Sequence, residues 1–206
     1  MKKTLYIIRH GETDLNRQGI IQGRGMNTDL NDWGQKQAAA FFEHYQHTPF
    51  DLIYTSTLKR THQTVAQFIQ KDIPWTQHEG LDELAWGIYE GKPSEITKPH
   101  FEELTAAWTN GELNRKFELG ESPLEVQARQ LTFLEEVKSL NTVENVLVWM
   151  HGRSLRLLLC TISGLPLSQM DQFPHSNVSL YKIYFDGKDF KRLSLSNNMD
   201  FISSSN

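Results

Sequence analysis

Short apolar runs alternate with amphipathic stretches along most of this chain. The runs rich in β-branched and aromatic residues predict buried strands, at about 4–9, 50–55, 74–78 and 146–150. The stretches with apolar positions three and four residues apart predict helices, at about 32–47, 58–70 and 154–163. Such alternation is typical of an α/β three-layer sandwich, in which helices cover both faces of a mostly parallel central sheet.

Turn and capping signals refine this prediction. Ser122-Pro123-Leu124-Glu125 combines a capping box with a Pro at the first helical position, so we expect a helix from there to about residue 140. Asp186-Gly187 predicts a two-residue hairpin turn between strands at 177–185 and 190–196, which would end the sheet in an antiparallel edge strand. The segment 94–119 fits the alternation poorly and is the candidate for a small helical cap insertion. We find no internal repeat or linker, so a single domain over 1–206 is expected.

The composition limits the function classes without naming one. The formal net charge of −4 and the lack of a basic stripe argue against a nucleic-acid or acidic-membrane binder. There is no signal-peptide pattern or apolar stretch of membrane-spanning length, and the single Cys160 suits a reducing compartment, so we expect a cytoplasmic protein. Cys160 sits in an apolar run and is interpreted as a small core residue rather than a nucleophile.

Two of the predicted strands deliver similar polar residues at their carboxyl ends. The first run is followed by Arg9-His10-Gly11, and the run at 146–150 is followed by His151-Gly152-Arg153. Because open α/β folds bind ligands at this edge of the sheet, these residues are expected to form one site. Arg60, at the start of the helix after the second strand, can face the same edge.

A positively charged site in an acidic protein predicts an anionic ligand. A phosphoryl group accounts well for the residues found there. The Arg9 and Arg60 guanidinium groups can pair bidentately with phosphate oxygens. An imidazole nitrogen can attack phosphorus and form a phosphohistidine. Glu83, in the loop after the third strand, is the candidate acid for the departing alkoxide. The histidines could also be metal ligands, but the flanking arginines would repel a cation, so neither a metal nor another cofactor is expected.

Several blocks of residues follow one another along the chain in a fixed order. They are Arg9-His10-Gly11-Glu12-Thr13 with Asn16, Gln22-Gly23-Arg24, Ser56-Thr57-Leu58-Lys59-Arg60-Thr61, Leu81-Asp82-Glu83, Gly120-Glu121-Ser122 with Arg129, and His151-Gly152. In this order and at this spacing they resemble the histidine phosphatase superfamily, in its phosphoglycerate mutase-like branch. Arg153 departs from the resemblance, because a Gly is frequent at that position in the family.

The resemblance implies a role for each matching residue. His10 would carry the phosphoryl group, with His151 as the second active-site histidine and Glu83 as the proton donor. The phosphate-binding residues that it implies are Arg9, Arg60, Asn16 and Gly152. The candidate substrate-binding residues are Thr13, Gln22, Gly23, Arg24 and Arg153, although Arg24 could instead be an exposed charge.

Three functions fit these residues. The favoured prediction is a metal-independent phosphomonoesterase that hydrolyses a small phosphorylated metabolite through a phosphohistidine, as a monomer or homodimer. The alternative is a phosphoglycerate mutase, and the third is a non-catalytic protein that binds a phosphorylated ligand. The short chain and the loop at 83–91 favour the phosphatase, because the mutases that this chain resembles are typically longer.

Three further residues are candidates to line the site. His175 precedes the strand predicted at 177–185 and could face the site from its loop. The loop of Trp86 could be a hydrophobic plug, or Trp108 and apolar residues of the cap could form a pocket for the part of the substrate beyond the phosphate.

Overall fold

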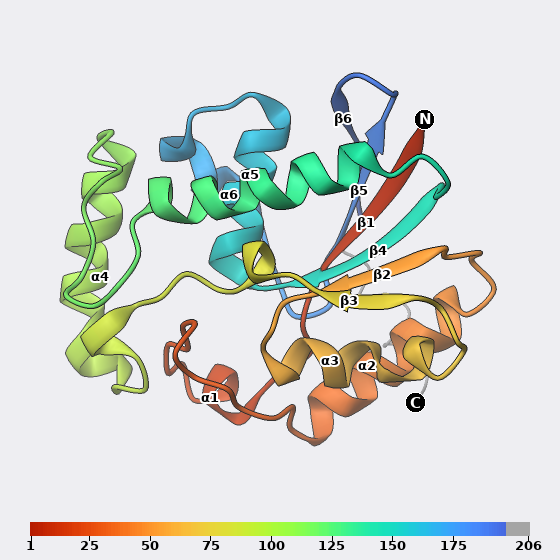
Figure 1. The fold of residues 1–206 in the computed structure, drawn as a ribbon. Coiled ribbons are helices and arrows are strands. Elements are labelled where there is room, and N and C mark those ends of the chain that lie inside the picture. The colour runs from red at the N-terminus through yellow and green to blue at the C-terminus, as the bar shows by residue number, and fades with distance from the viewer. Residues whose placement is uncertain (197–206) are drawn as a thin grey trace.

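A six-stranded sheet forms the centre of the computed structural model, which describes residues 1–196 (Figure 1). In the spatial order β3-β2-β4-β1-β5-β6, its strands are β1 (Lys3–Arg9), β2 (Leu52–Thr55), β3 (Trp75–Gln77), β4 (Asn145–Met150), β5 (Leu180–Phe185) and β6 (Phe190–Ser196). β4 pairs in parallel with both β1 and β2, and β2 pairs in parallel with β3. β5 pairs antiparallel with β1 and β6, so the predicted antiparallel part is confirmed at one end of the sheet.

Helices cover both faces of this sheet, as predicted. The helices over the sheet are α2 (Asp32–Tyr45), α3 (Lys59–Ile69), α5 (Pro123–Ser139) and α6 (Gly152–Ser163). On one face, α2 and α3 share an apolar core with Leu147 and Trp149 of β4. On the other face, α5 and α6 share a core with Val146 and Val148. Successive β4 side chains therefore enter different cores, since side chains alternate across a strand, and the strand is buried on both sides.

The start of α5 is fixed by its sequence, as the capping prediction requires. The Ser122 hydroxyl accepts a hydrogen bond from the Glu125 backbone N–H, and the Glu125 carboxylate accepts one from the Ser122 N–H at 2.8 Å. Pro123 occupies the first helical position, where its missing N–H costs no hydrogen bond. α6 begins at Gly152, directly after the second histidine, and ends at Gly164, whose φ of 65° suits glycine. The active-site edge therefore meets the N-terminus of α6.

Two local features differ from the sequence prediction. A short helix, α1 (Asp14–Arg17), interrupts the polar loop after β1, where Thr13 and Asn16 form a capping box. β5 begins at Leu180 rather than at 177, because Val178 has a left-handed φ of 62° and Asn177 donates to the carbonyl oxygen of His10. β5 ends and β6 begins at the predicted residues 185 and 190, and the Asp186 N–H donates to the Asp189 carbonyl across the turn at 3.1 Å. The Asp186 carboxylate accepts hydrogen bonds from the N–H groups of Lys188 and Asp189, which stabilises the turn.

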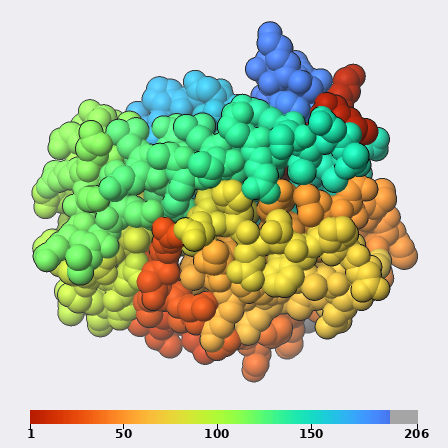
Figure 2. Space-filling model, viewed as in Figure 1, coloured from red at the N-terminus to blue at the C-terminus, as the bar shows by residue number. Residues whose placement is uncertain are grey.

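The predicted cap is a helix and a returning loop beside the sheet. α4 (Ser94–Thr109) lies at one end of the molecule, away from the strands (Figure 1). Its Phe101 and Trp108 rings pack against Trp86, with ring centroids 4.6 and 5.8 Å apart. In Figure 2 the loop after β1 is exposed at the surface, between the cap and the segment that follows β3. A backbone hydrogen bond from Gly91 to Ile21 joins this loop to the cap side of the molecule.

Candidate active site

The two histidines lie at the ends of neighbouring parallel strands. His10 follows β1 and His151 follows β4, and these strands are paired up to Arg9 and Met150. Both side chains are buried, and their ring centroids are 5.0 Å apart. The sheet thus brings together the two residues that the sequence pattern placed at one edge.

His10 is held as a neutral ring with one free nitrogen. Its Nδ1 lies 2.7 Å from the carbonyl oxygen of Gly11, and because a carbonyl only accepts, Nδ1 carries the proton. The other nitrogen, Nε2, then has a lone pair. Burial lowers the pKa of His10 well below its usual value, and the charges of Arg60 and Arg9 lower it further. A buried imidazole with an unprotonated Nε2 is suited to nucleophilic attack.

His151 is held differently, because both of its nitrogens have partners. Arg60 Nε donates to His151 Nδ1 at 3.2 Å, so the proton of the neutral ring is on Nε2. That nitrogen lies 2.7 Å from the hydroxyl oxygen of Ser56, to which it donates. Burial lowers the pKa of His151 well below its usual value, followed by the charges of Arg60 and His10. His151 is therefore fixed as a donor rather than as a nucleophile.

Two arginines bring positive charge to the site, and their charges repel each other. The Arg9 Nε atom is buried and has no hydrogen-bond partner among the described residues. The Arg60 side chain is buried, and its terminal nitrogens donate to the carbonyls of Met26 at 2.6 Å and Gly23 at 3.4 Å. Burial lowers the pKa of Arg60 to about 10, which still leaves it charged at neutral pH. An anion between these guanidinium groups would give Arg9 an acceptor and offset their mutual repulsion.

Asn16 and Gly152 lie where the resemblance placed them, around the same cavity. Asn16 lines the cavity and accepts a hydrogen bond from Asn177 Nδ2 at 3.3 Å. Asn177 also donates to the carbonyl oxygen of His10 at 2.9 Å. Sequence reasoning missed Asn177, because it precedes β5 and only the fold brings it to His10 and Asn16, which follow β1.

Gly152 leaves room for His175. A Cβ atom at Gly152 would lie 2.5 Å from His175 Cδ2 and 3.5 Å from Arg9 Nε, so only glycine allows this approach. His175 lines the cavity, as the sequence suggested it could. Burial lowers its pKa to about 3, with smaller contributions from Arg9 and Arg156. The imidazole of His175 is therefore neutral at the pH of most cells.

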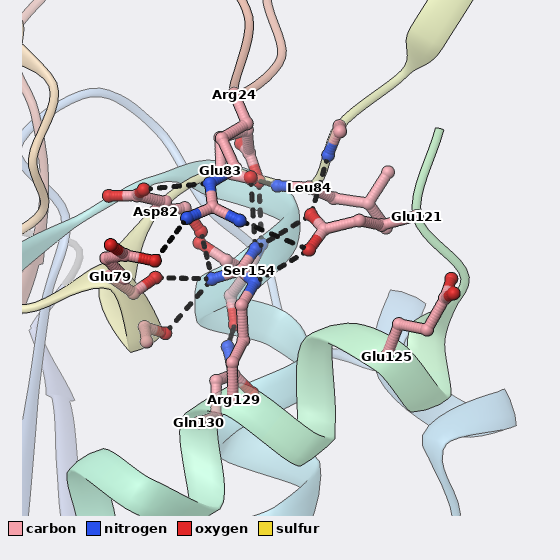
Figure 3. A network of polar contacts seen from close by, with 12 residues as sticks. Arg24, Glu79, Asp82, Glu83, Leu84, Glu121, Glu125, Arg129, Gln130 and Ser154 are labelled. Carbon is pink, nitrogen blue, oxygen red and sulfur yellow. Dashed lines mark hydrogen bonds and ion pairs between the residues drawn. The ribbon is translucent and has the colours of Figure 1, made fainter. Parts of the chain in front are cut away.

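Glu83 reaches the site from the segment after β3 and is held from two sides (Figure 3). Short 3₁₀ turns on this segment and later in the chain span Glu79–Leu81, Gly87–Tyr89 and Leu167–Gln172. The Glu83 carboxylate accepts hydrogen bonds from the backbone N–H groups of Ser154 at 2.9 Å and Arg153 at 3.1 Å. These N–H groups belong to the first turn of α6, where the helix dipole favours a negative charge.

Arg129 of α5 holds the backbone of the same segment. Its Nη1 donates to the carbonyls of Glu79, Gly80 and Asp82 at 2.9–3.2 Å, and its Nη2 donates to the carbonyl of Glu83 at 3.1 Å (Figure 3). One guanidinium group thus ties four carbonyls of the Glu83 segment to α5.

Three predicted substrate contacts lie behind the cavity instead of on it. Arg24 is not among the described residues that line it; its guanidinium pairs with Asp82 at 3.0 Å and Glu79 at 2.8 Å. The Gly23 carbonyl accepts from Arg60, and the Thr13 hydroxyl accepts from Asn16 N–H and Gln22 Nε2. Carboxylates from distant parts of the sequence gather around Arg24, which no local pattern could reveal.

The cavity has a volume of about 280 Å³, suited to a small metabolite. Its polar lining includes, from the predicted set, Arg9, His10, Asn16, Gln22, Glu83, Gly152 and Arg153. Its apolar wall consists of Ile20, Ile21, Trp86 and Phe101. Trp86 is therefore a wall of the cavity, while Trp108 is buried behind it in the core. The apolar residues Ile20, Ile21 and Phe101 were not predicted individually.

Two kinds of feature are absent from residues 1–196. No group of three or more His, Cys, Asp or Glu side chains is arranged to hold a metal ion. No helix in this part of the chain combines the length and apolar character needed to cross a membrane.

A mostly parallel sheet that brings histidines and arginines to one edge defines an α/β enzyme of the phosphatase and mutase type. The family model described as the histidine phosphatase superfamily (branch 1) matches residues 5–198, and the chain belongs to this family. The resemblance found in the sequence blocks is thus confirmed over nearly the whole chain.

Relatives of this chain carry different names within that family. Phosphoserine phosphatase 1 of Hydrogenobacter thermophilus is 29% identical over 183 residues, which cover 88% of this chain and 86% of that protein. A Yersinia pestis protein named "Probable phosphoglycerate mutase GpmB" is 30% identical over 181 residues, covering 87% and 83%. The solved structure of the alpha-ribazole phosphatase from Shigella flexneri is 25% identical, covers 93% of this chain and 95% of that one, and superposes with a TM-score of 0.81.

Proposed function

We propose that this chain is a phosphomonoesterase that hydrolyses a small phosphorylated metabolite through a phosphohistidine at His10, without a metal ion. The observation that carries the proposal is the pairing of a neutral His10, whose Nε2 has no proton, with the unpartnered Nε of Arg9. The first can attack phosphorus, and the second can hold the oxygens of the phosphoryl group. Positive side chains would then supply the charge that a metal ion supplies in other phosphatases.

The reaction has two balanced steps. In the first, the bound phosphate dianion favours the protonated form of Glu83 over its carboxylate. His10 Nε2 then forms a bond to phosphorus while the ester P–O bond breaks, and the departing oxygen takes the proton from Glu83. In the second, water attacks phosphorus, the P–N bond breaks, and Glu83 takes a proton from the water. Inorganic phosphate leaves, and His10 and Glu83 return to their starting states. Arg9, which lines the cavity, would stabilise the charge on the equatorial oxygens in both steps. Arg60 would add its positive charge from behind His151, whose N–H would turn from the Ser56 hydroxyl to the phosphoryl group.

A phosphoglycerate mutase is the second candidate function, because one relative carries that name. It would use the same first step and then return the phosphoryl group to a hydroxyl of the bound glycerate. Two relatives named as phosphatases, for phosphoserine and for alpha-ribazole phosphate, support hydrolysis as the first proposal.

One experiment separates these candidates. A set of phosphomonoesters that includes phosphoserine and alpha-ribazole phosphate is assayed for release of inorganic phosphate, and interconversion of 3- and 2-phosphoglycerate is followed in parallel. We expect phosphate release that persists in EDTA. Interconversion faster than phosphate release would favour the mutase, and loss of turnover in EDTA with recovery on adding a divalent ion would contradict the metal-free site. No turnover of any ester would contradict both enzymes.

A further inference from the structure

Arg153 places a positive charge in the cavity beyond the phosphate-binding arginines. It is in the first turn of α6 and lines the cavity, and its side chain is only 16% exposed. Its backbone N–H donates to Glu83 Oε2 at 3.1 Å. Because Glu83 is the proposed proton donor to the departing oxygen, Arg153 lies on the leaving-group side of the site.

The charge around Arg153 is only partly compensated. Its Nη1 pairs with Asp171 Oδ1 at 2.7 Å, and Arg156 Nη1 pairs with the same oxygen at 2.6 Å. Two arginines thus share one carboxylate, and Asp171 is itself half exposed to water. His175 beside them is neutral at ordinary pH, because its pKa is about 3. With Glu83 protonated, as the proposed function requires, one positive charge on this wall is left without a partner among the described residues.

Aromatic rings hold the Arg153 guanidinium group in place. Its central carbon lies 5.8 Å from the ring centre of Trp86 and 5.8 Å from that of Trp108. Such contacts favour a charged guanidinium and reduce the entropy that it loses when it binds a ligand. No described residue accepts a hydrogen bond from Arg153 Nε or Nη2. These donors form a planar fork of the kind that pairs with a carboxylate.

We propose that Arg153 selects substrates whose leaving group carries a carboxylate, so that the substrate class is a phosphorylated hydroxy acid or hydroxy amino acid. This proposal rests on the proposed function and adds the substrate class to it. Arg9 and Arg60 offset the charge of the phosphoryl group, and the single uncompensated charge near Arg153 matches one carboxylate. A second phosphate group would bring more negative charge than this wall can balance.

The test compares two substrates that differ only at the far end from the ester. In 3-phosphoglycerate the leaving group ends in a carboxylate, and in glycerol 3-phosphate it ends in a neutral hydroxymethyl group. We expect the wild-type protein to favour 3-phosphoglycerate by about 10–100-fold in kcat/KM, the size of one charge-assisted hydrogen-bond pair. Arg153→Gln is expected to remove most of this preference by raising KM for 3-phosphoglycerate, with little change for glycerol 3-phosphate. Arg153→Lys keeps the charge and loses the planar fork of donors, so its preference for 3-phosphoglycerate is expected to lie between those of the wild type and Arg153→Gln.

Two more variants control for folding and for general charge. Asp171→Asn removes the competing acid, so it is expected to lower KM for 3-phosphoglycerate. Arg115→Gln removes an arginine on the cap that pairs with Glu103 outside this cavity, and it is expected to leave the preference unchanged.

Specific outcomes would overturn the proposal. An equal kcat/KM for both esters in the wild type would show that Arg153 does not select substrates by their carboxylate. An equal loss of kcat/KM for both esters in Arg153→Gln would show the same. If p-nitrophenyl phosphate is hydrolysed in the same preparation, that result contradicts only the substrate class. If no ester is hydrolysed, the proposed function fails as well.

Discussion

The two strand ends of the site look alike in sequence and differ in structure. Each delivers a His next to a Gly and an Arg, and the two rings lie 5.0 Å apart. His10 is fixed through one nitrogen by the neighbouring Gly11 carbonyl, so its second nitrogen is left for a substrate. His151 is fixed through both nitrogens, by Arg60 and by Ser56.

This difference assigns separate chemical tasks to similar residues. A ring whose proton is held at Nδ1 presents a lone pair at Nε2, whereas a ring that accepts at Nδ1 presents an N–H at Nε2. Burial among arginines keeps both rings neutral, because their pKa values lie well below the usual range. Hydrogen-bond partners, rather than position in the sequence, therefore suit one histidine to nucleophilic attack and the other to donation in the proposed reaction.

The largest expected effect comes from removing the free nitrogen. His10→Ala is expected to lower kcat/KM by about 10⁴-fold or more, because no other group can form the covalent intermediate. His151→Ala is expected to cost about 10²–10³-fold, the size of one stabilising donor. Steady-state kinetics on both variants, with melting temperatures to confirm folding, measure the contrast. Equal losses would remove the distinction between the two rings.

Glu83→Gln separates nucleophilic attack by His10 from protonation of the leaving group by Glu83. The amide keeps the size of the side chain but cannot supply a proton, so esters of poor leaving groups such as glycerol or sugars should slow by about 10²–10⁴-fold. Aryl phosphates such as p-nitrophenyl phosphate should slow far less, because a nitrophenolate departs without protonation. Rates for a series of esters show how strongly the rate of each enzyme depends on the basicity of the leaving group. An equal loss across the series would mean that Glu83 positions the site and another group is the acid.

Arg129→Gln is expected to give a weaker version of the Glu83 effect. Losing the hydrogen bonds to the segment that carries Glu83 should displace its carboxylate, and small displacements of a catalytic group cost about 10–100-fold in rate. If Arg129 acts through Glu83, the loss is larger for alkyl than for aryl phosphates. Lys138→Gln, on the same helix, serves as the control, because the Lys138 ammonium contacts Glu135 and the Phe190 ring and not the Glu83 segment. A loss that does not depend on the leaving group would indicate a general structural role.

The smallest expected effect is on stability rather than on rate. His10, His151 and His175 have lower pKa values in the folded protein than the usual 6.5, so below about pH 6.5 the unfolded chain binds protons that the folded protein does not. The free energy of unfolding should therefore fall as the pH drops below that value. For His175 this loss continues to about pH 3.

A variant isolates this contribution. His175→Gln should reduce the slope of the unfolding free energy against pH by up to about 1.4 kcal/mol per pH unit in this range. His47→Gln, at an exposed position, is the matched control. Urea unfolding between pH 4 and 7 measures both slopes. An unchanged slope in His175→Gln would show that folding does not lower the pKa of this ring.

Most of the elements could be predicted because their signals are local. The alternation of apolar runs and amphipathic stretches predicted the parallel sheet, and Ser122 with Glu125 marked the start of α5. The helix α1 was missed, because its four residues contain a single apolar side chain, Leu15, and so have no apolar period to detect. The strand predicted from 177 begins only at Leu180, because the left-handed φ of 62° at Val178 interrupts the extended backbone.

The site was harder to predict than the fold, because its chemistry depends on contacts between distant residues. The sequence indicated which histidines and arginines share an edge, but not which ring nitrogen is free. Arg24 was predicted either to bind substrate or to be an exposed charge, and nothing in the local sequence indicated its ion pairs with Asp82 and Glu79. Asn177 was not predicted at all, since only the antiparallel pairing of β5 with β1 brings it near His10.

The central claim is that His10 carries the phosphoryl group, and labelling tests it most directly. A substrate with a radioactive phosphoryl group is mixed with the protein, denatured rapidly, and the label is located by peptide mapping. The account predicts an acid-labile, base-stable label on His10 in the wild type and in His151→Ala, and no label in His10→Ala. Label in His10→Ala, or an unlabelled wild type during active turnover, would contradict the account.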